Sequence, residues 1–250
     1  MDYNIITSID DNDFTLDKIN NKVDRNISQF PYSAAHIEEA DNYKADNQDE
    51  RDTFISKRLE KIQEITNGLY LYQELPSNKV FFLTERPTTV LETIRQVPFG
   101  KTAMQSLVNL IPFNQKTQLR ETLGIETIKL NNYKPDEVVG HLNAKLTTWG
   151  TNDTFIGLIE KSIELHPDGK SFGLHNRIAG VFELLDLFGY WKDRETTTSN
   201  YARLWDANHT HFASYCNYFI SDDKRTRNKA KVVYEIYDIQ TKVISSNGKE

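Results

Sequence analysis

Helix and strand patterns alternate over the C-terminal part of the chain. Residues 201–216 and 223–238 carry apolar side chains at helical spacing, whereas residues 217–221 and 241–245 are short runs rich in aromatic or β-branched residues. Strands that alternate with helices are typical of βαβ units, in which neighbouring strands are parallel. The alternation therefore predicts that this region contributes two strands to a parallel sheet flanked by helices.

The N-terminal region contains the other strand signals. Residues 3–9 are apolar and β-branched, which could end a strand or open a helix, and residues 69–72 have a strand pattern. Residues 15–28 and 54–65 have helical spacing. Ser33 has the side chain of a helix N-cap. Because strand signals lie near both ends of the chain, we expect one parallel sheet assembled from distant segments.

The middle of the chain has a different pattern. Prolines separate successive helical patterns, and few strand signals occur. We predict helices at residues 88–95, 101–110, 116–123, 136–149, 154–165 and 175–191. The sequence therefore predicts an α/β core made of residues 1–75 and 201–250, with residues 76–200 as an all-helical insertion or cap.

Composition excludes several classes of protein. A single cysteine permits no internal disulfide and favours a reducing compartment. No segment approaches the roughly 20 apolar residues of a membrane span, and the N-terminus lacks the pattern of a secretory signal. We therefore expect a cytoplasmic protein with no membrane partner. The net charge of −6 argues against a general nucleic-acid binder, but not against a nuclease, because a metal-binding carboxylate cluster is itself acidic.

Four acidic residues stand where a parallel sheet binds its ligands. Asp223 follows a predicted strand, and Asp206 lies near the start of a predicted helix. Glu39 is early in a helix, and Asp2 precedes a segment that could turn into one. Ligands bind beyond the carboxyl ends of parallel strands, so all four could reach one edge. Carboxylates suit Mg²⁺ or Mn²⁺, which can activate water for phosphoryl displacement. Taken singly, each acid could instead be a helix cap. The second choices, from spacing alone, are Glu38 and Asp222.

A longer pattern surrounds these acids. Asp206 lies on a helix, the strand after it ends in the turn Ser221-Asp222-Asp223, and another helix follows. This succession resembles the C-terminal half of PIN domains, a family of Rossmann-like metal-dependent ribonucleases. Asp2-Tyr3-Asn4 resembles the opening of that family, and Ser33 to Glu39 resembles its second segment.

The resemblance covers roughly residues 1–72 and 201–250 but not the middle. It implies a PIN-like three-layer α/β fold, with a central parallel sheet between helices and a large all-helical insertion. It also implies an endoribonuclease that acts on RNA or single-stranded nucleic acid. The implied metal ligands and catalytic residues are Asp2, Glu39, Asp206 and Asp223, with Asn4 and Ser221 as polar support.

Two departures from the family pattern leave an alternative open. The first Asp of the family ends a central strand, whereas only Met1 precedes Asp2. Either the true start lies upstream or the central strand is shortened. The inserted middle is also larger than in compact PIN domains, and it could cap the site or bind a partner. The alternative is a catalytically inactive PIN-like module that binds or regulates, with a second copy of the chain or a regulatory protein as partner; pairing as a toxin is a further analogy.

Basic and histidine residues near these acids have their own interpretations. Lys224 and Arg225 could contact phosphates, together with the other basic residues of the same helix, Arg227, Lys229 and Lys231. A solvated helix face is the simpler interpretation. His209 and Cys216 share an apolar helical stripe and are predicted to be core residues. Arg203 and His209 also fit the Arg-x5-His spacing of metal-independent HEPN ribonucleases, a short pattern that arises easily by chance.

Overall fold

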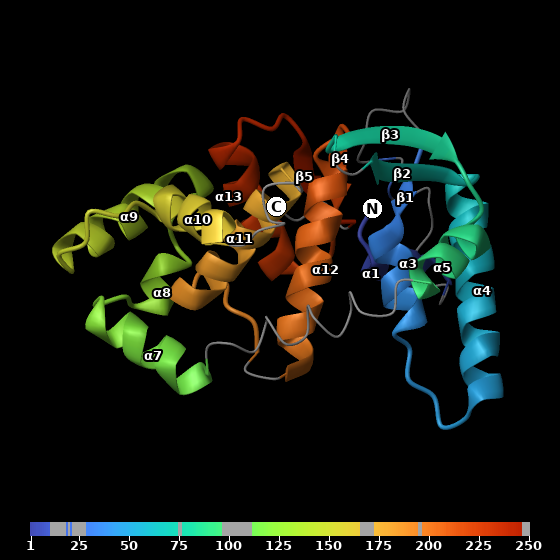
Figure 1. Ribbon diagram of the computed structural model, residues 1–250, viewed down its shortest axis with the longest axis horizontal. Helices are drawn as coiled ribbons and strands as arrows, with labels where there is room; N and C mark the ends of the chain where they lie inside the picture. The colour runs from blue at the N-terminus through green and yellow to red at the C-terminus, as the bar shows by residue number, and fades with distance from the viewer. Residues whose placement is uncertain are drawn as a thin grey trace.

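The computed structural model shows a mixed α/β protein (Figure 1). It describes residues 1–10, 19, 21, 29–74, 77–96, 112–165, 173–194 and 197–246. The predicted helices at residues 15–28 and 101–110 lie almost wholly outside these residues. None of the described helices is both long enough and apolar enough to cross a membrane.

The N-terminal elements follow from local signals. Ser33 is the N-cap of one helix, as predicted. Asn47 is the N-cap of a second helix, and its side chain accepts a hydrogen bond from the Glu50 N–H. That second helix ends at Asn67, whose φ of 50° lies in the left-handed region. The elements are α1 (Tyr3–Asp10), β1 (Tyr32–Ser33), α3 (Ala34–Asp41), α4 (Gln48–Thr66), β2 (Leu69–Glu74), β3 (Lys79–Thr84) and α5 (Pro87–Arg95).

The rest of the described chain is mainly helical until its last part. The middle elements are α7 (Phe113–Thr122), α8 (Thr127–Leu130), α9 (Pro135–Thr148), α10 (Phe155–Leu165) and α11 (Leu174–Phe188). The C-terminal elements are α12 (Thr197–Ala213), β4 (Tyr218–Ile220), α13 (Lys224–Ile236) and β5 (Lys242–Ile244). The predicted alternation of helix and strand after residue 200 is therefore confirmed.

The strands form two small sheets where we predicted one central parallel sheet. β1 and β2 are parallel, and so are β4 and β5, but no described ladder joins the two pairs. The backbone N–H of Asp2 donates to the carbonyl of Ile220 at 2.8 Å, which places the first residues of the chain beside β4.

β3 corrects the prediction of an all-helical middle. It pairs with β2 in the antiparallel direction, with Leu69 opposite Thr84 and Glu74 opposite Lys79. The run Val80-Phe81-Phe82-Leu83 is rich in residues that favour strands. α5 follows this strand and packs on α3 and α4, so these two elements beyond residue 75 belong with the N-terminal region.

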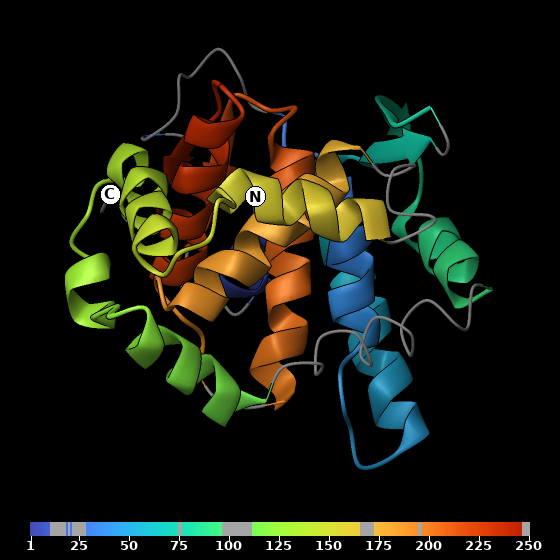
Figure 2. The same cartoon turned by 60° about the vertical axis from the view of Figure 1, so that its left-hand side comes forward.

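Two hydrophobic cores meet at α12 and β4. One core combines residues of α9, α10 and α11 with Ala207, Phe219 and Val243, and the other combines residues of α1, α3, α4 and α5 with Ile220. Successive side chains of a strand face opposite ways, so Phe219 and Ile220 enter different cores. Both views show α12 between the helical group and the elements around β1 and β2 (Figures 1 and 2). Side chains of α12 can therefore meet groups from both halves.

Candidate metal-binding site

Asp2 is held in place by its backbone and by two polar side chains. Its N–H bonds to β4, and its Oδ1 accepts a hydrogen bond from the N–H of Tyr3 at 2.8 Å, at the start of α1. Its Oδ2 accepts from the Ser221 hydroxyl at 2.6 Å and from the Asn4 side-chain amide at 2.8 Å. Asn4 and Ser221 thus occupy the supporting positions that the resemblance implied. The Asp2 side chain is buried, so its charge has little access to water.

Glu39 reaches the same place from the second turn of α3. The Ser33 N–H donates to His36 Nδ1 at 3.0 Å at the start of this helix. His36 Nε2 lies 2.8 Å from the Met1 carbonyl oxygen, which can only accept, so His36 carries its proton on Nε2. This ring therefore connects the beginning of α3 to the first residue of the chain, and it fixes where Glu39 faces.

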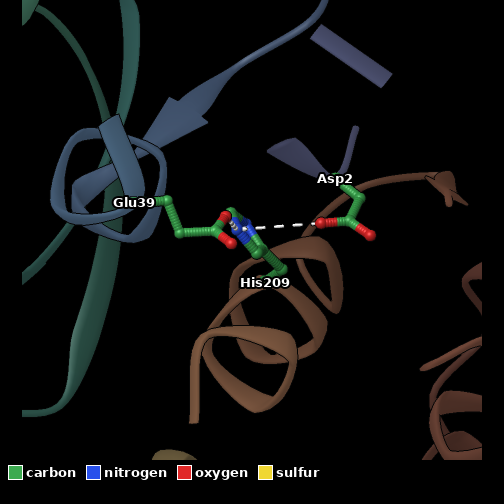
Figure 3. Close-up of side chains that lie close together, drawn as sticks. All are labelled: Asp2, Glu39 and His209. Carbon is green, nitrogen blue, oxygen red and sulfur yellow. Dashed lines mark hydrogen bonds and ion pairs between the residues drawn. The ribbon is translucent and has the colours of Figure 1, made fainter. Parts of the chain in front are cut away.

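His209 of α12 lies between Glu39 and Asp2 (Figure 3). Its Nε2 is 2.7 Å from Glu39 Oε2 and 3.8 Å from Asp2 Oδ1. One ligand atom from each of the three residues lies within 4.8 Å of the other two. The prediction that His209 is buried is confirmed, since it is 2% exposed. Its contact with the acids was not predicted.

Asp206, another of the four predicted acids, lies one turn before His209 on α12. Burial raises the pKa of Asp206 well above its ordinary value, and the charges of Asp2, Glu39 and Asp223 raise it further. Lys229 acts in the opposite direction but does not compensate. The structure therefore brings Asp206 within electrostatic range of the other three predicted acids.

Other groups of the cluster are shifted for the same physical reason. Burial raises the pKa of Asp2, and the charge of Glu39 adds to the shift. Burial, followed by the charge of Glu38, raises the pKa of Glu39 to about 8. Burial lowers the pKa of His209 to about 4, although the Asp2 charge opposes this. At neutral pH the imidazole is therefore uncharged and does not balance the charge of the carboxylates.

Asp223 lies at the beginning of α13 and is partly buried. Its Oδ1 accepts from the backbone N–H groups of Arg225 at 2.6 Å and Thr226 at 3.4 Å, so it is the N-cap of that helix. Its own N–H donates to the Ser221 hydroxyl at 3.2 Å. The capping role that is common for an Asp at a helix start thus coexists with the electrostatic influence on Asp206.

The two second-choice acids face elsewhere. Asp222 is exposed, and its carboxylate accepts hydrogen bonds from the N–H of Ser246, at 2.9 Å, and from the hydroxyl of that residue. Glu38 contributes, after burial and Tyr72, to the raised pKa of Tyr70, so its charge acts towards β2. Of the two neighbours Glu38 and Glu39, Glu39 therefore lies nearer to the cluster. Of the two neighbours Asp222 and Asp223, Asp223 lies nearer.

The basic residues of α13 do not form a single exposed face, which corrects the simple picture of a charged surface. Lys224 is exposed, with its Nζ 4.6 Å from the centroid of the Trp191 ring, and Arg225 is partly exposed. Arg227 is buried and donates to the Ser221 carbonyl at 2.8 Å. Lys229 is buried and contacts both oxygens of Asp193 at 3.1 Å. Of these four, only Lys224 and Arg225 have exposed surface for a phosphate.

Arg203 belongs to a separate buried ion-pair network. Its guanidinium contacts Glu183 at 2.7 Å, Asp193 at 3.0 Å and Asp186 at 3.1 Å. The ion pairs among the described residues connect Lys116, Glu183, Asp186, Asp193, Arg203 and Lys229. Six residues apart, Arg203 and His209 point about 120° apart around α12. They contact different carboxylates, so the geometry gives no support to a site made by this pair.

Comparison of the chain with protein-family models, with curated proteins and with solved structures finds no match. The candidate site therefore stands on its own geometry. It is a group of buried and partly buried carboxylates with one neutral, buried imidazole, assembled from segments far apart in the chain.

Proposed function

We propose that this protein is a divalent-metal-dependent nuclease with a PIN-like fold, which hydrolyses phosphodiester bonds of RNA internally. The observation that carries this proposal is that Asp2 and Glu39 meet at His209, and that the charges of Asp2, Glu39 and Asp223 raise the pKa of Asp206, a shift that Lys229 does not offset. A buried cluster of like charges is costly unless protons or a cation neutralise it. Mg²⁺ or Mn²⁺ is a cation of the right chemistry for oxygen ligands.

The order of the strands supports the proposed fold. The first two residues lie beside β4 through the Asp2 N–H, and the Met1 carbonyl lies against His36 at the start of α3, directly after β1. If Met1-Asp2 takes the place of a first strand, the order becomes β3, β2, β1, Met1-Asp2, β4, β5. Apart from the antiparallel edge strand β3, this is the 3-2-1-4-5 order of doubly wound folds, whose ligands bind where the order reverses. Asp2 is at that reversal.

Each residue of the cluster has a definite part in this proposal. Asp2, Glu39, Asp206 and Asp223 would hold the ion, and Asn4 and Ser221 orient the Asp2 carboxylate. When bound, the ion would polarise phosphoryl oxygens and lower the pKa of an attacking water. Lys224 and Arg225, at the beginning of α13, would hold the phosphates of the substrate on the exposed side. The preference for RNA rests on the resemblance to PIN domains.

The decisive experiment measures cleavage of labelled single-stranded RNA and DNA with Mn²⁺ or Mg²⁺, and with EDTA. We expect metal-dependent cleavage that Asp206→Asn lowers by at least about a hundredfold, since even outer-shell changes cost metal sites 10–100-fold. The matched control is Asp136→Asn, an exposed acid on α9, which should cleave like the unmodified protein. Equal cleavage by Asp206→Asn, or cleavage that survives EDTA, would refute the proposal.

The alternative function is an inactive binding or regulatory module of the same fold. The observation that favours it is the net charge of −6, because a protein that holds and cuts a phosphate backbone is usually basic on at least one face. A folded protein that binds single-stranded RNA, a second copy of itself or another protein, but cleaves nothing with any added metal, would support this alternative.

A further inference from the structure

We infer that His209 is a nitrogen ligand of the proposed metal site, and that the site consequently binds first-row transition ions such as Mn²⁺ in preference to Mg²⁺. This inference rests on the proposed function, because it concerns the same carboxylates. The inference goes beyond the proposed function because it specifies the class of ion. Four acidic residues alone would leave that class open.

The position of the imidazole is the first argument. His209 Nε2 faces two of the acids, 2.7 Å from Glu39 and 3.8 Å from Asp2, and Figure 3 shows the ring between them. An ion that reached both carboxylates could not avoid this nitrogen. The side chain is 2% exposed, so water does not compete freely for it.

The surroundings of the ring are the second argument. Its Nδ1 is buried without a hydrogen-bond partner among the described residues. The ring is instead oriented by the edge-to-face contact with His36, at 4.4 Å between centroids. Both nitrogens of His36 have partners, the Met1 carbonyl and Ser33. His209 therefore has a fixed position, and its Nε2, which is hydrogen-bonded to Glu39, can bind an ion when the ring carries its proton on Nδ1.

The chemistry of the ligand set gives the selectivity. Mg²⁺ is a hard ion that prefers oxygen ligands and retains several waters. Imidazole nitrogen binds first-row transition ions better, with affinity that rises from Mn²⁺ through Fe²⁺ and Co²⁺ to Ni²⁺. Replacing one oxygen by an imidazole thus shifts the preference of a carboxylate site away from Mg²⁺.

The test is a direct measurement of metal binding by the full chain. Calorimetric titration with Mg²⁺, Mn²⁺ and Co²⁺ should rank the affinities Co²⁺ over Mn²⁺ over Mg²⁺. His209→Gln should weaken Mn²⁺ binding by at least about tenfold, the lower end of the cost of disturbing a metal site, and affect Mg²⁺ less. His141→Gln on α9, whose ring stacks on Tyr133, is the matched control and should bind like the unmodified protein.

Pulsed electron paramagnetic resonance of the Mn²⁺-loaded protein supplies a second readout. We expect coupling of Mn²⁺ to a ¹⁴N nucleus, which disappears in His209→Gln or, should that variant fail to fold, in His209→Asn. The inference is wrong if the unmodified protein binds Mn²⁺ without nitrogen coupling, or if the variants retain the Mn²⁺-to-Mg²⁺ affinity ratio. Those results leave the nuclease proposal standing as long as Asp206→Asn abolishes metal-dependent cleavage. If Asp206→Asn binds and cleaves normally, the proposed function has failed instead.

Discussion

Two buried groups of charged residues share helix α12, and they differ in how their charges are matched. In the ion-pair network, the three cations Lys116, Arg203 and Lys229 face the three carboxylates Glu183, Asp186 and Asp193. Burial alone would raise the pKa of Asp186, yet Arg203 and Lys229 lower it to about 2. In the candidate metal-binding site, burial and neighbouring acids raise the pKa of Asp206 and Glu39.

This difference is the basis for proposing a structural role for the network and a functional role for the candidate metal-binding site. A balanced network is complete without any other molecule, and it ties α7, α11, α12 and α13 together. The site one turn further along α12 has carboxylates and a neutral imidazole, with Lys229 as the cation that reaches Asp206. Under the proposed function, such a group lowers stability because the activity requires it.

The largest expected effect is the loss of the central cation from the network. Arg203→Met should lower the free energy of unfolding by about 3–5 kcal/mol, because three carboxylates lose their shared buried partner. The measurement is chemical denaturation at pH 7. The control is Arg177→Met, which breaks the half-exposed pair with Glu160 and should cost less than about 1 kcal/mol. A similar loss of stability in both variants would mean that the network stabilises the fold no more than a half-exposed ion pair does.

The next largest effect concerns the candidate metal-binding site. Mn²⁺ at about one hundred times its dissociation constant should raise the free energy of unfolding by about 2.7 kcal/mol, because the ion binds the folded state. Thermal unfolding with Mn²⁺ and with EDTA measures this. Asp206→Asn should remove most of the gain, whereas Arg177→Met should keep it. If Mn²⁺ does not stabilise the unmodified protein, the contrast between the two groups of charged residues does not hold.

A smaller effect is the pH dependence of the metal-free protein. The pKa of Glu39 is about 8 in the folded state, above that of an unfolded Glu, so its contribution to stability is lost as the pH rises towards 8. His209, with its lowered pKa, opposes this only below its unfolded pKa of about 6.5. Between pH 6.5 and 8, stability should fall by up to about 1.4 kcal/mol per pH unit for each such proton.

Denaturation in EDTA at several pH values between 6.5 and 8 tests this slope, and saturating Mn²⁺ should flatten it. A flat profile without metal would show that the carboxylates of the site do not titrate in this range.

The smallest expected effect is a gain in stability, whereas most substitutions lower stability. In EDTA at pH 8, Asp206→Asn should stabilise the protein by about 1 kcal/mol, because it removes one of several buried like charges. For a chain of this length such a gain raises the melting temperature by about 2–4 °C. Differential scanning calorimetry can resolve that shift. A lower melting temperature would indicate that the carboxylate stabilises the fold through a contact of its own.

Local signals in the sequence predicted the elements that hold the site. The Ser33 cap, the turn after residue 220 and the helix that carries Asp206 depend on residues close in the chain, and all three are present. β3 was missed because its four apolar residues form a short run beside long helical patterns, and its pairing with β2 decides its structure.

The contacts of the site were less accessible from the sequence. The helical stripe of His209 correctly indicated burial, but Glu39 lies 170 residues away in sequence. The ion-pair network combines α12 with residues of α7, α11 and α13, so spacing along any one helix could not indicate it. The charge balance of a site arises from tertiary packing, whereas caps and turns arise from neighbouring residues.

The hydrogen bond from Ser221 to Asp2 joins residues 219 positions apart. At a synthesis rate of 5–20 residues per second, roughly 10–45 s separate the appearance of the two side chains, and such distant contacts form late in folding. A nascent chain therefore carries Asp2 without Ser221 for that interval. If the cluster cuts RNA, we expect the nascent chain to be inactive until the segment that carries Asp206 and Ser221 has been made.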